Sequence, residues 1–136
     1  MGFEFYMHFH RDGELVQIGK QVLLDAFQPF VVPKSEDKHG WWELDYGKDG
    51  SCHLALGLEE TVTDLALIRP VASPRLMESI LRVMQLWNGV LYWPGSRPMI
   101  TDESIRPHVN AEMIEALGPA VVIGTTDDIL AELHGP

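Results

Sequence analysis

Cysteine and basic residues are scarce in this sequence. Among 136 residues there is one cysteine, Cys52, which excludes an intramolecular disulfide and any metal site built from several cysteines. Ten lysines and arginines stand against twenty aspartates and glutamates, so the formal net charge is −10 at pH 7. Such an excess of negative charge repels nucleic acid and anionic membranes and favours basic partners. We therefore expect a basic protein as partner, with no nucleic acid and no membrane. A charged surface that serves only solubility is the alternative explanation of the same excess.

Long apolar runs are also missing. No stretch approaches the roughly 18 consecutive apolar residues that indicate a membrane span. The N-terminal stretch 1–14 places polar residues at every second position, and it lacks the basic start and continuous apolar region of a signal peptide. A single cysteine fits a reducing compartment. The sequence therefore predicts a cytoplasmic protein.

The sequence contains none of the common catalytic motifs. It has no Gly-x-Ser-x-Gly nucleophile turn and no His-Glu-x-x-His helix. Gly47-x-x-Gly50 reads as hairpin turn chemistry, and Pro94-Gly95-Ser96 lacks the lysine and helix start of a phosphate-binding loop. We expect no cofactor, and we expect binding rather than catalysis.

Apolar periodicity predicts one α+β domain over residues 1–136. The length is near the most common domain size, and no shift in composition marks a linker. Alternating and helical patterns predict the order β-α-β-β-β-α-β followed by a helical C-terminal region, in a two-layer domain with a mostly antiparallel sheet. The predicted strands cover 3–9, 41–46, 52–58, 61–68 and 90–93. The predicted helices cover 15–27, 73–88, 109–117 and 126–133. Asp12 is the expected cap of the first helix and Ser73 that of the second. Residues 120–123 form either a strand or a buried coil.

A hairpin around residues 47–50 is the clearest local signal. Apolar side chains alternate on both arms, and the apolar faces must match across the pair. A three-residue loop over 48–50, with Gly50 in the left-handed position, satisfies this condition. The predicted pairs are Tyr46 with Cys52, Leu44 with Leu54 and Trp42 with Leu56.

Two histidines lie two residues apart on the first predicted strand. His8 and His10 therefore point to the same face, together with Tyr6 and Glu4. Two imidazoles at this spacing can share a metal ion, with a carboxylate as third ligand. Strand alternation alone also explains their positions, as the outer face of a half-exposed strand. A small enzyme or metal-binding protein using His8 and His10 is thus an alternative function.

The predicted hairpin register sets His53 opposite Asp45. A carboxylate beside an imidazole can orient it as a general base, but the same pair also makes an ordinary cross-strand contact. No nucleophile motif accompanies the pair. Cys52 falls on the apolar face, where a buried cysteine acts as a small apolar residue.

The polar face of the hairpin is the predicted partner-binding surface. Trp41 falls on this face with Glu43 and Asp45, and an aromatic flanked by carboxylates can anchor a basic partner. The alternative is that Trp41 is covered by a helix or lies over Gly57, the glycine opposite it. We expect a small, acidic, non-catalytic binding protein of toxin-neutralising or regulatory type, by analogy of charge and size with small acidic inhibitors. A homo-oligomer whose exposed strand faces pack together is a further alternative.

Overall fold

The computed structural model describes residues 4–134, so Phe3, expected in the first strand, lies outside the described residues. The longer strands are β1 (Glu4–Arg11), β4 (Trp41–Asp45), β5 (Ser51–Ala55), β7 (Asp64–Ile68) and β8 (Gly89–Tyr92). The short strands, of two residues each, are β2 (Glu14–Leu15), β3 (Ile18–Gly19), β6 (Thr61–Val62), β9 (Met99–Ile100) and β10 (Val121–Val122). The helices are α1 (Lys20–Ala26), α2 (Pro74–Trp87), α3 (Ala111–Leu117) and α4 (Thr126–His134), with 3-10 turns η1 (Gly47–Asp49) and η2 (Glu103–His108).

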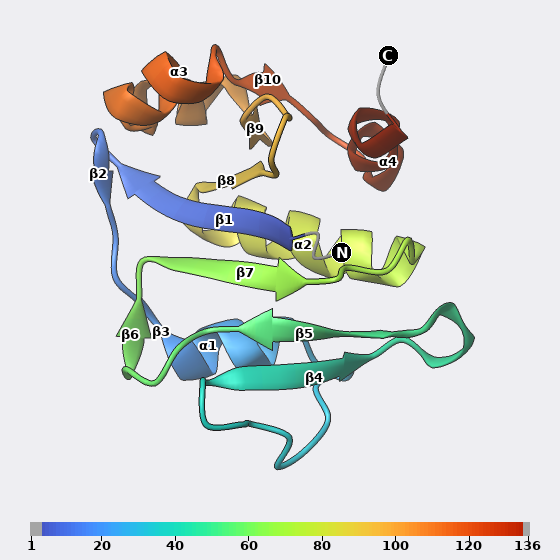
Figure 1. The fold of residues 1–136 in the computed structure, drawn as a ribbon. Coiled ribbons are helices and arrows are strands. Elements are labelled where there is room, and N and C mark those ends of the chain that lie inside the picture. Colours follow the sequence, from blue (N-terminus) through green and yellow to red (C-terminus); the bar gives the residue numbers. More distant parts are fainter. Residues whose placement is uncertain (1–3, 135–136) are drawn as a thin grey trace.

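One large sheet dominates the fold. Its strand order is β10-β9-β8-β1-β7-β5-β4, with β2 paired to β1, and β3 and β6 form a separate pair. All strand pairs are antiparallel except β9 with β10. Figure 1 shows β8, β1, β7, β5 and β4 one below another. The protein is therefore an α+β fold with a mostly antiparallel sheet, in which β7 lies between β1 and β5.

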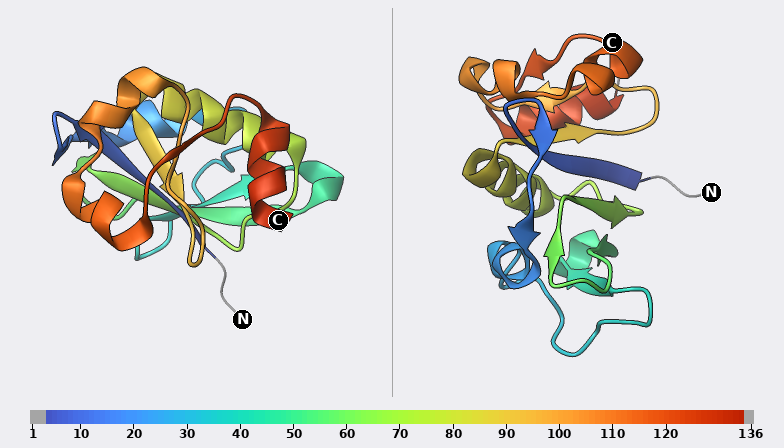
Figure 2. Two further views of the ribbon diagram at one scale, coloured as in Figure 1. Left: turned by 90° about the horizontal axis from the view of Figure 1, so that it is seen from above. Right: turned by 90° about the vertical axis from the view of Figure 1, so that its left-hand side faces the viewer.

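The main core lies between one face of this sheet and the helices α1, α2 and α4. Strand alternation sends Phe5, Met7 and Phe9 to this face, where each is at most 1% exposed. Figures 1 and 2 show α1 and α2 together on this side of the strands. The core also takes the alternate residues of the neighbouring strands, including Leu44, Cys52, Leu54, Leu65 and Leu67.

A second, smaller core covers part of the opposite face. Val90 points to that face because it pairs with His8, and it packs with Ile100 beneath η2 and α3. The residues that η2, α3 and the segment after it contribute are Ile105, Val109, Ala120, Met113 and Ile114. The part of the opposite face that η2 and α3 cover is therefore that of β8 and β9. On this opposite face, none of the strand residues of β4, β5 and β7 is buried.

The helix predicted over 15–27 is wrong in its first part. Asp12 does not begin a helix; Asp12 and Gly13 form the two-residue turn of the β1–β2 hairpin, in which Arg11 pairs with Glu14. Both turn residues have positive φ, 51° and 81°, as a type I′ turn requires. The helix α1 begins only at Lys20. Asp-Gly between two stretches of alternating polar and apolar residues favours a hairpin. The hairpin forms here although the residues after it have helical spacing.

The register predicted for the β4–β5 hairpin is also wrong, by two residues. The structure pairs Leu44 with Cys52 and Trp42 with Leu54, so Tyr46 lies beyond the last strand pair. The loop is longer than expected because η1 adds a 3-10 turn, and the backbone N–H of Tyr46 donates to the Gly50 carbonyl. The parity of the pairing is as predicted, so the apolar faces still match.

The other helices lie close to their predicted ranges. Ser73 is the residue before α2, but its hydroxyl donates to Asp49 instead of capping the helix. Asn88 ends α2 in the left-handed conformation. The turn η2, begun by Asp102 through its side chain, was not predicted.

The outer edge of β4 is covered by the chain segment that precedes it. The Val32 N–H donates to the Glu43 carbonyl, and the Asp45 N–H donates to the Phe30 carbonyl. The Glu43 N–H donates to the Ser35 hydroxyl. Further along, the Asp37 N–H donates to the carbonyl of Trp41, and the Trp41 N–H donates to the Asp37 carboxylate. Residues 30–37 therefore complete the hydrogen bonding of this strand.

Candidate functional site

The face of the sheet opposite the main helices places a row of aromatic and small residues across four strands. Cross-strand pairing aligns Trp41 on β4, Ala55 on β5, Ala66 on β7 and Tyr6 on β1. The row continues to Tyr92 on β8, whose ring lies 5.4 Å from that of Tyr6. All five side chains are half-buried. Aromatic rings in this state carry a large apolar area that a partner can still cover.

Carboxylates flank this aromatic row. Glu43, His53, Ile68 and Glu4 form the neighbouring row across the same four strands. The open face is defined here by the outward residues of β1, β4, β5 and β7: Glu4, Tyr6, His8, Trp41, Glu43, Asp45, Ser51, His53, Ala55, Asp64, Ala66 and Ile68. These residues include four carboxylates and no lysine or arginine.

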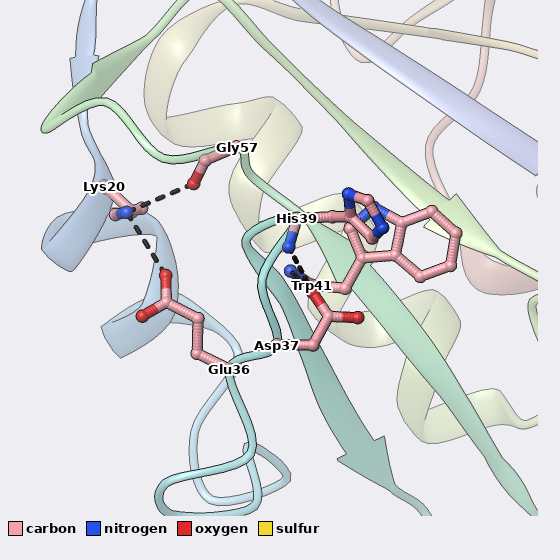
Figure 3. Close-up of polar contacts among 6 residues, drawn as sticks. All are labelled: Lys20, Glu36, Asp37, His39, Trp41 and Gly57. Atoms are coloured by element: carbon pink, nitrogen blue, oxygen red, sulfur yellow. Dashed lines mark hydrogen bonds and ion pairs between the residues drawn. The ribbon is translucent and has the colours of Figure 1, made fainter.

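Trp41 is held in place by the loop before β4 (Figure 3). The Asp37 carboxylate accepts hydrogen bonds from the backbone N–H groups of His39, at 2.8 Å, and Trp41, at 3.0 Å. These bonds lower the pKa of Asp37, the Trp41 N–H most strongly. Lys20 ties the same loop down by contacting Glu36, at 3.4 Å, and the Gly57 carbonyl, at 3.2 Å. The indole of Trp41 is therefore presented by a fixed backbone.

The structure has Trp41, Glu43 and Asp45 on one face, as predicted. His53 lies on the same face, but its cross-strand partner differs from the predicted one. Because the register is shifted, His53 pairs with Glu43 and not with Asp45. Its ring is exposed and lies 5.9 Å from the ring of Trp41. Asp45 accepts a hydrogen bond from the Gly47 N–H and so serves the turn. The predicted His53–Asp45 pair is therefore not formed.

His8 and His10 share a face, as predicted, but their surroundings differ. His10 is 1% exposed, and its Nδ1 accepts the backbone N–H of Asn110 at 3.1 Å. His8 is half-buried, and its Nε2 lies 3.1 Å from the Tyr92 hydroxyl. Burial lowers the pKa of both rings, that of His10 to about 4. Both histidines are therefore neutral near pH 7.

The metal alternative finds little support in this geometry. The two rings lie 6.2 Å apart, centroid to centroid, and one nitrogen of each already has a partner. Within residues 4–134, no group of three or more His, Cys, Asp or Glu side chains could hold a metal ion. Among the described residues, the pair therefore has no third ligand of the kind that zinc sites require.

The segment before α3 buries His10 by docking on the β1–β2 turn. The Asn110 side-chain amide donates to the Gly13 carbonyl at 2.9 Å, and the Asp12 N–H donates to Nδ1 of His108. The Asn110 side chain also accepts from the Glu112 N–H and so caps α3. Asn110 is about one hundred residues from His10 in sequence, so no local signal in the sequence could have shown this contact.

A cavity of about 390 Å³ lies where α3 meets the open face. Its walls are polar on the β1 and β8 side, where His8, His10 and Tyr92 lie, and mixed on the α3 side. The remaining lining residues are Leu15, Asn110, Glu112, Met113, Ala116 and Leu117. Sequence reasoning found the two histidines but missed this cavity.

Comparison with known proteins gives no relative. No family model, curated protein or solved structure matches this chain. Within the described residues, none of the helices is long and apolar enough to cross a bilayer.

This arrangement is suited to binding. Cys52 is buried against the core, and burial raises the pKa of its thiol to about 11, which keeps it protonated and unreactive. His53 lies opposite Glu43 on the exposed face of the hairpin, not opposite Asp45 as predicted. The open face offers aromatic area and negative charge, which are recognition features.

Proposed function

We propose that this protein is a non-catalytic binding protein whose open face engages a basic protein partner. The observation that supports it is the composition of that face: aromatic rings accompanied by four carboxylates, without lysine or arginine, on the side of the sheet opposite α1 and α2 (Figure 1). A partner surface rich in lysine and arginine complements this charge, and the net charge of −10 adds long-range attraction.

Trp41 is the proposed anchor of the complex. It is half-buried and lies at the end of the aromatic row, with Glu43 and His53 beside it. The bonds of Asp37 and Lys20 fix its backbone before binding, so little conformational entropy is lost when the partner arrives. An indole also attracts the guanidinium and ammonium groups of a basic surface.

The carboxylates have a different role. Asp45 and Asp64 are exposed and Glu43 is half-buried, so the electric field of these carboxylates extends into the surrounding solvent. Exposed charges steer the encounter and set its salt dependence more than they hold the finished complex. A role in neutralising a cationic toxin or in regulating a basic enzyme, within the cytoplasm, fits this combination of small size, acidity and binding face.

The proposal is tested by capture from the cell of origin followed by kinetics with the purified partner. Trp41→Ala should raise the dissociation rate by about 30-fold, as for a central aromatic anchor. The double variant E43Q/D45N should instead lower the association rate, and the association rate of the parent should fall about tenfold or more from low to high salt. Glu78→Gln on α2, an exposed carboxylate away from this face, is the matched control and should change neither rate.

Several outcomes contradict the proposal. A captured protein whose affinity is unchanged in W41A and in E43Q/D45N does not bind this face. A partner that binds equally at high salt is not selected by charge. If the solution mass shows a dimer that W41A dissociates, the open face is instead a self-association surface, which is the homo-oligomer alternative.

A further inference from the structure

The cavity beside α3 is lined by a histidine that has a hydrogen-bond donor without a partner among the described residues. His10 lines this cavity and is 1% exposed. Its Nδ1 accepts the Asn110 N–H, so in the neutral ring the proton is on Nε2. That Nε2 is buried and finds no acceptor among the described residues. A buried donor left without an acceptor costs stability, and such a group calls for an explanation.

The structure points to a small-molecule site: we propose that this cavity binds an uncharged, largely apolar molecule whose carbonyl oxygen accepts the Nε2–H of His10. This site goes beyond the proposed function, because it does not require the protein partner. A cavity of about 390 Å³ lies within the usual range for ligand pockets. Apolar walls with a few polar groups are typical of such sites.

The apolar body of the ligand would lie against α3. Leu15, Met113 and Leu117 supply the apolar side of the cavity, and Ala116 leaves room at its edge. Leu15 is 48% exposed, so it leaves apolar area for a ligand to cover.

The polar groups argue against a charged ligand. His10 and His8 are neutral near pH 7 because burial lowers the pKa of each. The carboxylate of Glu112 lines the same cavity, and the whole chain is acidic, so an anion would be repelled. A neutral carbonyl accepts a hydrogen bond without bringing charge. The Tyr92 hydroxyl and His8, already 3.1 Å apart, form a second polar group on the same β1 and β8 side of the cavity.

The test uses three matched probes and protein with ¹⁵N-labelled histidine. Acetophenone has an apolar ring and a carbonyl, ethylbenzene has the same shape without the acceptor, and benzoate carries a charge. We expect acetophenone to bind about tenfold more tightly than ethylbenzene, since one hydrogen bond to an unpartnered donor separates them. We also expect it to shift the His10 Nε2 resonance and to bind more tightly than benzoate.

Two variants on α3 locate the binding. Ala116→Phe should fill the cavity and abolish binding of acetophenone, while Ala111→Phe on the same helix, outside the cavity, should leave binding unchanged. Both positions are exposed, so both variants should fold. Equal binding of acetophenone and ethylbenzene, tighter binding of benzoate, or binding retained in A116F would each overturn the proposal. So would an unchanged His10 resonance at saturating probe, which would leave Nε2 with a buried water.

Discussion

The burial of His10 predicts that the protein loses stability as the pH falls below neutrality. In the unfolded chain the ring titrates near pH 6.5, whereas in the folded protein its pKa is lowered to about 4, first by burial and then by His8. Above pH 6.5 the ring is neutral in both states. Between pH 6.5 and pH 4 the unfolded state binds a proton that the folded state does not, so unfolding becomes easier.

The size of this effect follows from linkage. Each pH unit in that window costs about 1.4 kcal/mol, so lowering the pH from 6.5 to 5 should remove about 2 kcal/mol of stability through His10 alone. This is a large share of the 5–15 kcal/mol typical of a domain. The pKa of His8 is lowered as well, so His8 adds a loss of the same sign.

Urea unfolding at several pH values between 5 and 8 measures the effect. The carboxylates also titrate toward the lower end, so the comparison is between the parent and His10→Gln, which retains polar groups but does not titrate. The free energy difference between the two should shrink by about 2 kcal/mol from pH 7 to pH 5. Parallel curves for the two proteins would show that His10 is not held neutral, and the account of its burial would be refuted. His8→Gln is the companion variant. It should remove only the contribution of His8 to the loss of stability at low pH, which is smaller than that of His10.

Three further predictions concern packing. Leu54→Ala should lower the free energy of unfolding by about 2–5 kcal/mol in a urea titration, because Leu54 is fully buried between β4 and β7; an unchanged midpoint would contradict this packing. Gly40→Ala should lower the melting temperature more than Gly95→Ala: both have positive φ, but only at Gly40 would a Cβ lie 2.2 Å from the Gly57 carbonyl oxygen. Cys52 should not react with a thiol reagent until the protein is unfolded, and rapid labelling of the native protein would contradict its burial.

The sequence predicted those parts of the fold that depend on local pattern. Alternation identified β1, β4, β5 and β7 and the faces of their side chains, so Trp41, Glu43 and Asp45 fall together as expected. A shift of two residues leaves the faces unchanged, which is why alternation could not fix the hairpin register. The 3-10 turn η1 lengthens the loop and so sets the β4–β5 register, which in turn sets the cross-strand partner of His53.

The environment of His10 was beyond local reasoning for a different reason. Alternation gave the direction of its side chain but not what covers it, because the cover comes from Asn110 and α3 at the far end of the chain. Asp12-Gly13 is itself a local turn signal, but the apolar residues that follow it have helical spacing, and these two local patterns predict different structures. The long-range contact made a half-exposed strand position into a buried one.

The covering of β4 by residues 30–37 has a consequence for how other chains can associate with this protein. Backbone N–H and carbonyl groups of Trp41 and Glu43, and the N–H of Asp45, are already bonded within the chain. The backbone groups that an incoming peptide would need for hydrogen bonding are therefore occupied. The peptide cannot extend the sheet at this edge as an additional strand. Fibril-like growth from this edge is blocked in the same way. If the proposed partner binds beside β4, it must do so through side chains, and substitutions of Trp41, Glu43 or Asp45 would then change partner choice without altering the backbone.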